Sequence, residues 1–106
     1  VGRASVLGEF GGLGLSVKGH LWQQDQNWGY RDYGSAEDLA KQYAALYDQL
    51  RPLIDRGLAA AVYTQITDVE TEVNGLITYD RKVIKIPVET LAPLHRAVIG
   101  HAETEK

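Results

Sequence analysis

Short apolar runs alternate with longer polar segments along this chain. The first run, at residues 3–10, ends at the glycine cluster Gly11-Gly12-Leu13-Gly14, which predicts a buried strand that leads into a loop. The second run, at residues 58–63, is apolar without alternation and leads into β-branched residues. This pattern favours a strand buried on both faces of a parallel sheet, although its alanines are also compatible with a helix.

A helix is predicted between the two strands. Ser35 is a good N-cap, Glu37 and Asp38 place negative charge in the first turn, and Gly57 stands where the helix would stop. Apolar residues recur between these signals at spacings of mostly three and four: Leu39, Tyr43, Leu46, Tyr47, Leu50, Leu53 and Ile54. Pro52 removes one backbone hydrogen bond, so we expect a kink near residues 47–50 or a separate last turn.

The last third of the chain predicts a loop, an extended stretch and a helix. Acidic and amide residues at positions 68–75 indicate a second functional loop, and residues 83–86 form a brief extended stretch. Thr90 can cap a final helix that carries Pro93 in its first turn and ends at Gly100. The order strand, loop, helix, strand, loop, helix predicts a parallel α/β architecture.

The segment from residue 11 to residue 34 is a long predicted loop that is rich in aromatic and amide side chains. These are His20, Trp22, Gln23, Gln24, Gln26, Asn27, Trp28, Tyr30 and Tyr33. Loops of this length are uncommon in compact domains and are usually functional or disordered. Because the aromatic content argues against disorder, we expect this loop to contribute to a functional site.

Length and composition limit the chain to one folding unit, residues 1–106. It has 106 residues, of which 44% are hydrophobic and 24% charged, as in ordinary globular proteins. Two main strands cannot close a barrel or cover both faces of a sheet. The chain also contains no Met, even at position 1. We therefore expect a piece of a longer protein.

Charge and cysteine usage exclude several classes. The 11 basic and 14 acidic residues give a net charge of -3 with no basic block, which argues against nucleic acid as a partner. The absence of cysteine excludes disulfides and thiolate chemistry but leaves the compartment open. No apolar run approaches the roughly 18 residues of a membrane span. Neither a dinucleotide-binding Gly-x-Gly-x-x-Gly motif nor a Gly-x-Ser-x-Gly motif is present.

A single carboxylate, Glu9, stands at the end of the first predicted strand in the segment Gly8-Glu9-Phe10-Gly11-Gly12. In α/β barrels this end of the strands carries the active site. With this segment the chain resembles glycoside hydrolase family 2, the family of many β-galactosidases and β-glucuronidases, whose seventh barrel strand ends in a similar motif with the glutamate as nucleophile. The resemblance continues through residues 63–70 and 74–82, which look like the eighth strand and the segment after it.

The resemblance implies a fragment of a (β/α)8 TIM barrel, strands 7 and 8 with their helices, from a cofactor-free retaining glycosidase that hydrolyses β-linked glycosides. Glu9 would form a covalent glycosyl-enzyme while a second carboxylic acid protonates the departing oxygen. In the family that acid comes from the fourth strand, which would lie upstream of Val1 with the rest of the barrel. Many barrel glycosidases have a tryptophan at the end of the eighth strand, where this chain has Tyr63-Thr64-Gln65. The identity of the sugar that would be hydrolysed is therefore left open.

Six further residues are candidate sugar-binding groups: His20, Trp22, Trp28, Tyr63, Gln65 and Asp68. Aromatic faces suit the C–H faces of pyranose rings, whereas amides and carboxylates bind hydroxyl groups. The aromatic residues of the predicted loop at residues 11–34 could equally have a structural role and hold that loop in place by packing. From spacing alone, Glu9 could equally be a solvated glutamate paired with Arg3 or Arg31. No metal is expected, because His20 has no second histidine or cysteine at ligand spacing.

The acidic residues of the second loop have two interpretations. Asp68, Glu70 and Glu72 could bind a cation or sugar hydroxyls, or they could be solvated or paired with Arg81 and Lys82. We favour the second interpretation for Glu72 and the first for Asp68.

Two alternatives to the glycosidase hypothesis belong to other classes. A non-catalytic carbohydrate-binding or scaffolding barrel would lack the partner acid. A small autonomous α/β interaction domain would fold alone, with Glu9 exposed and without a partner.

Overall fold

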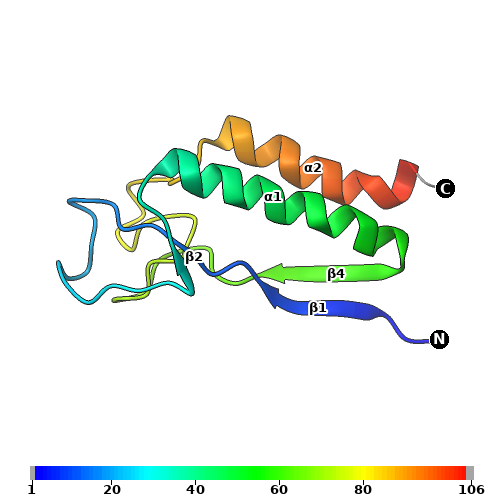
Figure 1. The fold of residues 1–106 in the computed structure, drawn as a ribbon, viewed down its shortest axis with the longest axis horizontal. Coiled ribbons are helices and arrows are strands. Elements are labelled where there is room, and N and C mark those ends of the chain that lie inside the picture. Colours follow the sequence, from blue (N-terminus) through cyan, green and yellow to red (C-terminus); the bar gives the residue numbers. More distant parts are fainter. Residues whose placement is uncertain (1, 105–106) are drawn as a thin grey trace.

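The computed structural model describes residues 2–104 and shows two helices on one side of short parallel strands (Figure 1). Strand β1 (Ser5–Phe10) pairs in parallel with β4 (Leu58–Tyr63), and helix α1 (Ala36–Asp55) connects them. Helix α2 (Val88–Thr104) follows β4. The predicted order of a strand, a helix and a parallel strand is confirmed, and the molecule is a small mixed α/β fold.

Helix α1 begins and ends at the predicted residues. The Ser35 hydroxyl accepts a hydrogen bond of 3.1 Å from the Asp38 N–H, and Gly57 adopts a φ of 108° just past the helix. The helix continues through Pro52 to Asp55, so the separate last turn does not form. Pro52 lies close to the end of the helix, where its carbonyl still accepts from the Arg56 N–H at 3.2 Å.

Helix α2 is longer at both ends than the sequence predicts. It begins at Val88, because the carbonyl of Pro87 accepts the N–H groups of Thr90 and Leu91 at 2.9 and 3.0 Å. Thr90 therefore lies in the first turn and does not cap the helix. The helix also continues past Gly100, which corrects the predicted end. Glycine inside a helix costs only about 1 kcal/mol relative to alanine, so it does not by itself end one.

The polar segments after β1 and β4 are connected to each other by backbone hydrogen bonds. We call residues 11–35 the first loop region and residues 64–87 the second loop region. Strands β2 (Leu13–Gly14) and β3 (Arg31–Asp32) form a short parallel pair within the first region. The N–H of Leu15 donates to the carbonyl of Val73 at 2.9 Å, and the N–H of Val73 donates to the carbonyl of Trp28 at 2.7 Å. The two loop regions thus form one layer beyond the strand ends.

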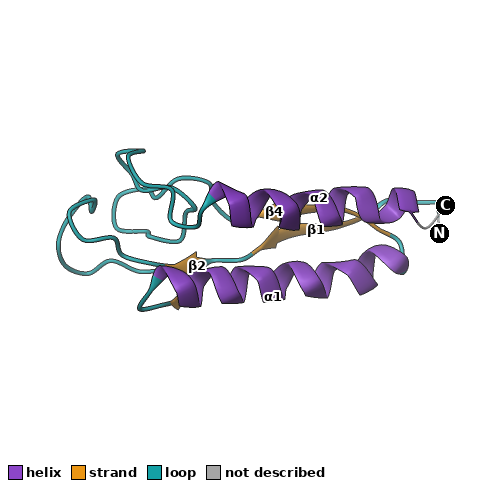
Figure 2. Ribbon diagram, turned by 90° about the horizontal axis from the view of Figure 1, so that it is seen from above, coloured by secondary structure: helices purple, strands orange, loops and turns teal. Residues whose placement is uncertain are grey.

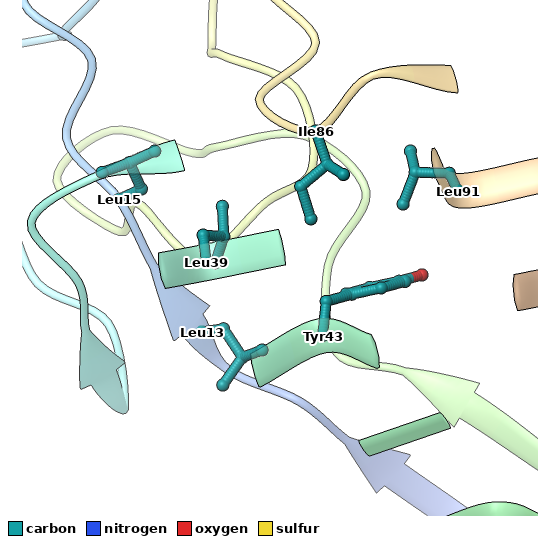
Figure 3. Close-up of a cluster of buried hydrophobic side chains, with 6 residues drawn as sticks. All are labelled: Leu13, Leu15, Leu39, Tyr43, Ile86 and Leu91. Atoms are coloured by element: carbon teal, nitrogen blue, oxygen red, sulfur yellow. The ribbon is translucent and has the colours of Figure 1, made fainter. Parts of the chain in front are cut away.

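The hydrophobic core lies where both helices begin, next to the loop regions. It consists of six buried side chains shown in Figure 3: Leu13, Leu15, Leu39, Tyr43, Ile86 and Leu91. They come from both loop regions and from the N-terminal parts of α1 and α2. This core therefore fixes the loop layer relative to the helices.

Strand β4 is less buried than the sequence predicts. Residues 59–62 are exposed, and Val62 and Val6 are 53% and 55% exposed. The helices cover one face of the β1–β4 pair (Figures 1 and 2), and no described residue covers the other face with a second layer. The short alanine side chains also leave an apolar groove of about 710 Å³ between β4 and the helices.

Candidate functional site

Glu9 lies at the C-terminal end of β1, beside the C-terminal end of β4. The two strands are parallel, and Phe10 pairs with Tyr63 at the last position of the ladder. The Glu9 side chain is exposed and does not line the groove between β4 and the helices. Among the side chains that the structure describes it has no hydrogen bond or ion pair, so neither Arg3 nor Arg31 neutralises it.

A β-bulge sets the direction of this part of β1. Leu7 pairs with Ala61 and Phe10 with Tyr63, so three steps along β1 correspond to two along β4. The extra residue falls at Gly8-Glu9. It leaves Phe10 to pack edge-on against Tyr47 of α1, with ring centroids 5.8 Å apart. Bulges of this kind redirect side chains next to active sites.

Two glycines after Glu9 allow aromatic rings to approach the backbone closely. Gly11 and Gly12 have φ values of 107° and 77°, in the region that favours glycine. A Cβ atom on Gly11 would lie 2.5 Å from the Tyr63 ring, and one on Gly12 would lie 2.5 Å from the Tyr30 ring. The segment after Glu9 therefore has no room for larger residues at these two positions.

His20 connects the two loop regions through Asp80. Its Nδ1 atom lies 2.7 Å from Oδ2 of Asp80, and the side chains are 30% and 20% exposed. Oδ1 of Asp80 accepts hydrogen bonds from the Thr78 hydroxyl at 2.6 Å and from the Lys82 N–H at 3.1 Å. The bonds from Thr78 and His20 lower the pKa of Asp80 to about 2.

The two predicted tryptophans lie in separate aromatic pairs. Trp22 is 60% exposed and meets Tyr79 of the second loop region edge-on, with ring centroids 5.7 Å apart. Trp28 is 41% exposed and meets Tyr30 of its own region at 5.5 Å. Both rings thus stabilise the loops, and both keep exposed surface that a ligand can contact.

Tyr63 belongs to the aromatic cluster between the sheet and the helices. Its ring centroid lies 5.3 Å from that of Phe10 and 5.1 Å from that of Tyr43. Burial raises the pKa of the Tyr63 phenol, and its hydroxyl has no hydrogen-bond partner among the described residues. The neighbouring Gln65 is half-buried, and its Nε2 group likewise has no partner there.

Asp68 forms a buried ion pair that the sequence does not predict. Its Oδ1 atom lies 2.8 Å from Nζ of Lys85 and also accepts the Gly75 N–H at 2.8 Å. Burial raises the pKa of Asp68 and lowers that of Lys85, whereas their ion pair opposes both shifts. Oδ1 of Asp68 therefore has a structural role, and its Oδ2 atom is buried without a partner in the described chain.

The structure adds Lys85, Asp80 and Asn74 to the residues that organise the loop layer. The sequence offered one signal for a buried cation: Lys85 stands between Ile84 and Ile86 in a predicted extended stretch. Asn74 is fully buried and donates to Glu72 Oε1 at 3.1 Å. Glu72 is therefore bonded to a neighbouring amide, and no ion pair joins it to Arg81 or Lys82 within the described residues.

Metal-binding clusters and membrane spans are both absent from the described chain. Among the side chains that the structure describes, no group of three or more His, Cys, Asp or Glu could hold a metal ion. In the same part of the chain, no helix combines the length and apolar character needed to cross a membrane.

Comparison with known proteins does not assign the chain to a family, since no family model and no curated protein matches it. The resemblance to glycoside hydrolase family 2 therefore rests on the sequence segments themselves.

Proposed function

We propose that this chain is the seventh and eighth βα units of a retaining β-glycosidase barrel, with Glu9 as the catalytic nucleophile. The observation that carries the proposal is the position of Glu9: an exposed carboxylate without a partner in the described residues, on a β-bulge at the C-terminal end of a parallel strand. Active sites of (β/α)8 barrels lie at that end of the strands.

The arrangement of the strands supports the same proposal. β1, α1 and β4 form one βαβ unit, and the segments after both strands pack together in the loop layer. The exposed second face of the β1–β4 pair is the surface that the interior of a barrel would cover. The two strands would then be buried on both faces, as their apolar sequences predict.

In the proposed reaction the Glu9 carboxylate attacks the anomeric carbon of a β-glycoside. The bond from that carbon to the leaving oxygen breaks, and a second carboxylic acid of the barrel protonates that oxygen. The same group then removes a proton from water, which attacks the anomeric carbon and releases Glu9. The two inversions together retain the configuration. In this proposal the second acid comes from another strand of the barrel, outside these 106 residues.

The test uses the intact protein that contains this chain. A panel of aryl β-glycosides identifies a hydrolysed sugar, and Glu9→Gln is then assayed on that sugar. The amide is nearly isosteric but is not nucleophilic, so we expect nearly all turnover to be lost while folding is unchanged. Glu89→Gln is the matched control, because Glu89 is an exposed acid in the first turn of α2, and it should keep its activity.

A covalent probe tests the nucleophile directly. A 2-deoxy-2-fluoro β-glycosyl fluoride of the same sugar should attach to the peptide that contains Glu9, as mass spectrometry would show. Activity of Glu9→Gln within about tenfold of the parent would refute the assignment. Binding of sugars without hydrolysis of any glycoside would favour the non-catalytic barrel.

A further inference from the structure

Two contacts join the same two segments of the loop regions, and the residues that form these contacts are close neighbours in the sequence. His20 contacts Asp80, and Trp22, two residues later, contacts Tyr79, the residue before Asp80. Both segments lie in the loop layer, which extends from the tip of β1 to the end of the molecule opposite the two termini (Figure 1). These contacts hold His20 and Trp22 in defined positions although both belong to a long loop.

The hydrogen bonds of Asp80 determine which nitrogen of His20 carries the proton. The Asp80 carboxylate, whose pKa is about 2, is ionised near neutral pH and can only accept hydrogen bonds. The Nδ1 atom of His20 must therefore carry a proton. In the neutral ring this leaves a lone pair on Nε2, which has no partner among the described residues. A sugar hydroxyl is a donor that suits this acceptor.

The aromatic pair beside His20 offers a surface for stacking. Trp22 is 60% exposed and Tyr79 is 38% exposed, although each ring contacts the other. An edge-on pair leaves the face of one ring open, and an indole or phenol face suits the apolar C–H face of a pyranose. An acceptor and an aromatic face on the same two segments are the two elements of a sugar subsite.

We propose that His20, Trp22 and Tyr79 form a second sugar-binding subsite, separate from the position of Glu9, with Thr78 and Asp80 as positioning residues. The proposal rests on the proposed function for its ligand class and deepens it: the substrate is an oligosaccharide whose further sugar units contact the loop layer, rather than a glycoside of a single sugar.

The test measures binding to the intact protein with Glu9→Gln in the background, so that hydrolysis does not consume the ligand. The probes are the β-1,4-linked tetrasaccharides of glucose, galactose, mannose and xylose and the matching monosaccharides, titrated by calorimetry. We expect at least one tetrasaccharide to bind. Trp22→Ala should weaken it by about tenfold, and His20→Ala by about fivefold, as expected for the loss of one stacking or hydrogen-bonding group.

Three comparisons separate binding from folding. Lys18→Ala shortens an exposed side chain of the same loop region and should change the dissociation constant by less than about twofold. Trp22→Phe keeps an aromatic face and should restore most of the affinity. The monosaccharide should bind equally to the parent and to Trp22→Ala.

The proposal is overturned if no tetrasaccharide binds, or if Trp22→Ala binds it as well as the parent does. Equal weakening of monosaccharide and tetrasaccharide would place Trp22 at the Glu9 position and would also overturn it. These outcomes are measured by binding and do not depend on hydrolysis. They are therefore distinguishable from unchanged turnover in Glu9→Gln, the result that would refute the proposed nucleophile.

Discussion

Nζ of Lys85 lies 2.8 Å from Oδ1 of Asp68, and both side chains are almost completely buried. The ammonium group also donates to the carbonyl of Val73 at 2.9 Å, and Asp68 also accepts the N–H of Gly75. The ion pair thus joins three parts of the second loop region: the segment after β4, the turn at Val73 and Gly75, and the stretch that leads into α2. We expect this pair to be the main polar support of the loop layer.

Replacement of Lys85 by methionine should destabilise the protein strongly. Removal of one partner leaves the Asp68 carboxylate buried without its counter-ion, a change that costs about 3–5 kcal/mol in comparable pairs. The free energy of unfolding, measured by urea denaturation of the intact protein, gives the size of the effect. Lys82→Met, at an exposed position, is the control and should change stability by less than about 0.5 kcal/mol.

A double variant tests whether the loss comes from the unpaired charge. Lys85→Met combined with Asp68→Leu removes both charges, so it should recover a large part of the stability that Lys85→Met loses. A double variant as unstable as the single one would show that packing around Lys85, rather than the charge of Asp68, determines the effect.

Gly75→Ala should destabilise the same turn for a steric reason. A Cβ atom at Gly75 would lie 2.5 Å from the backbone of Thr67 and Asp68, and backbone atoms move less easily than the end of a side chain. We expect a loss on the order of 1–3 kcal/mol in the free energy of unfolding. Gly34→Ala is the matched control, because a Cβ atom added there would have no other atom within 4 Å, and equal losses in the two variants would contradict the explanation.

Asp80 should make the loop layer sensitive to acid. Its folded-state pKa of about 2 lies below the ordinary aspartate value of 3.8, so its contribution to stability is present above about pH 4 and is lost as the pH falls toward 2. Asp80→Asn should therefore be less stable than the parent at about pH 6, and the difference should shrink between about pH 4 and pH 2. Midpoints of urea unfolding across this range measure it, and a constant difference at all pH values would contradict the assignment.

The isolated 106-residue chain should fold poorly or aggregate. Its main sheet has two strands, and Val6 and Val62 remain more than half exposed on it. Such small sheets are marginal in water, and exposed strand edges pair with other chains. Light scattering and a thermal unfolding curve of the purified chain provide the test.

A cooperative transition in a monomeric sample would favour the alternative of a small autonomous domain. Both hypotheses predict an exposed Glu9, so in that case the exposure of Glu9 would no longer support the barrel hypothesis.

The sequence alone determined the elements whose signals are local. An apolar run before a glycine cluster placed β1, and Ser35 and Gly57 fixed the two ends of α1. Residues 58–63 were predicted as a strand and form β4. Caps, positive φ angles and hydrophobic periodicity act between residues a few positions apart, so they can be read without knowledge of the rest of the fold.

The tertiary structure decided which distant groups meet. His20 contacts Asp80, sixty positions away, and Asp68 pairs with Lys85 rather than with a ligand at its Oδ1 atom. The extra residue in β1 at Glu9 depends on its register with β4, which no local signal encodes. Burial and ion pairing depend on how the two loop regions pack together, and that packing arises from long-range contacts between side chains.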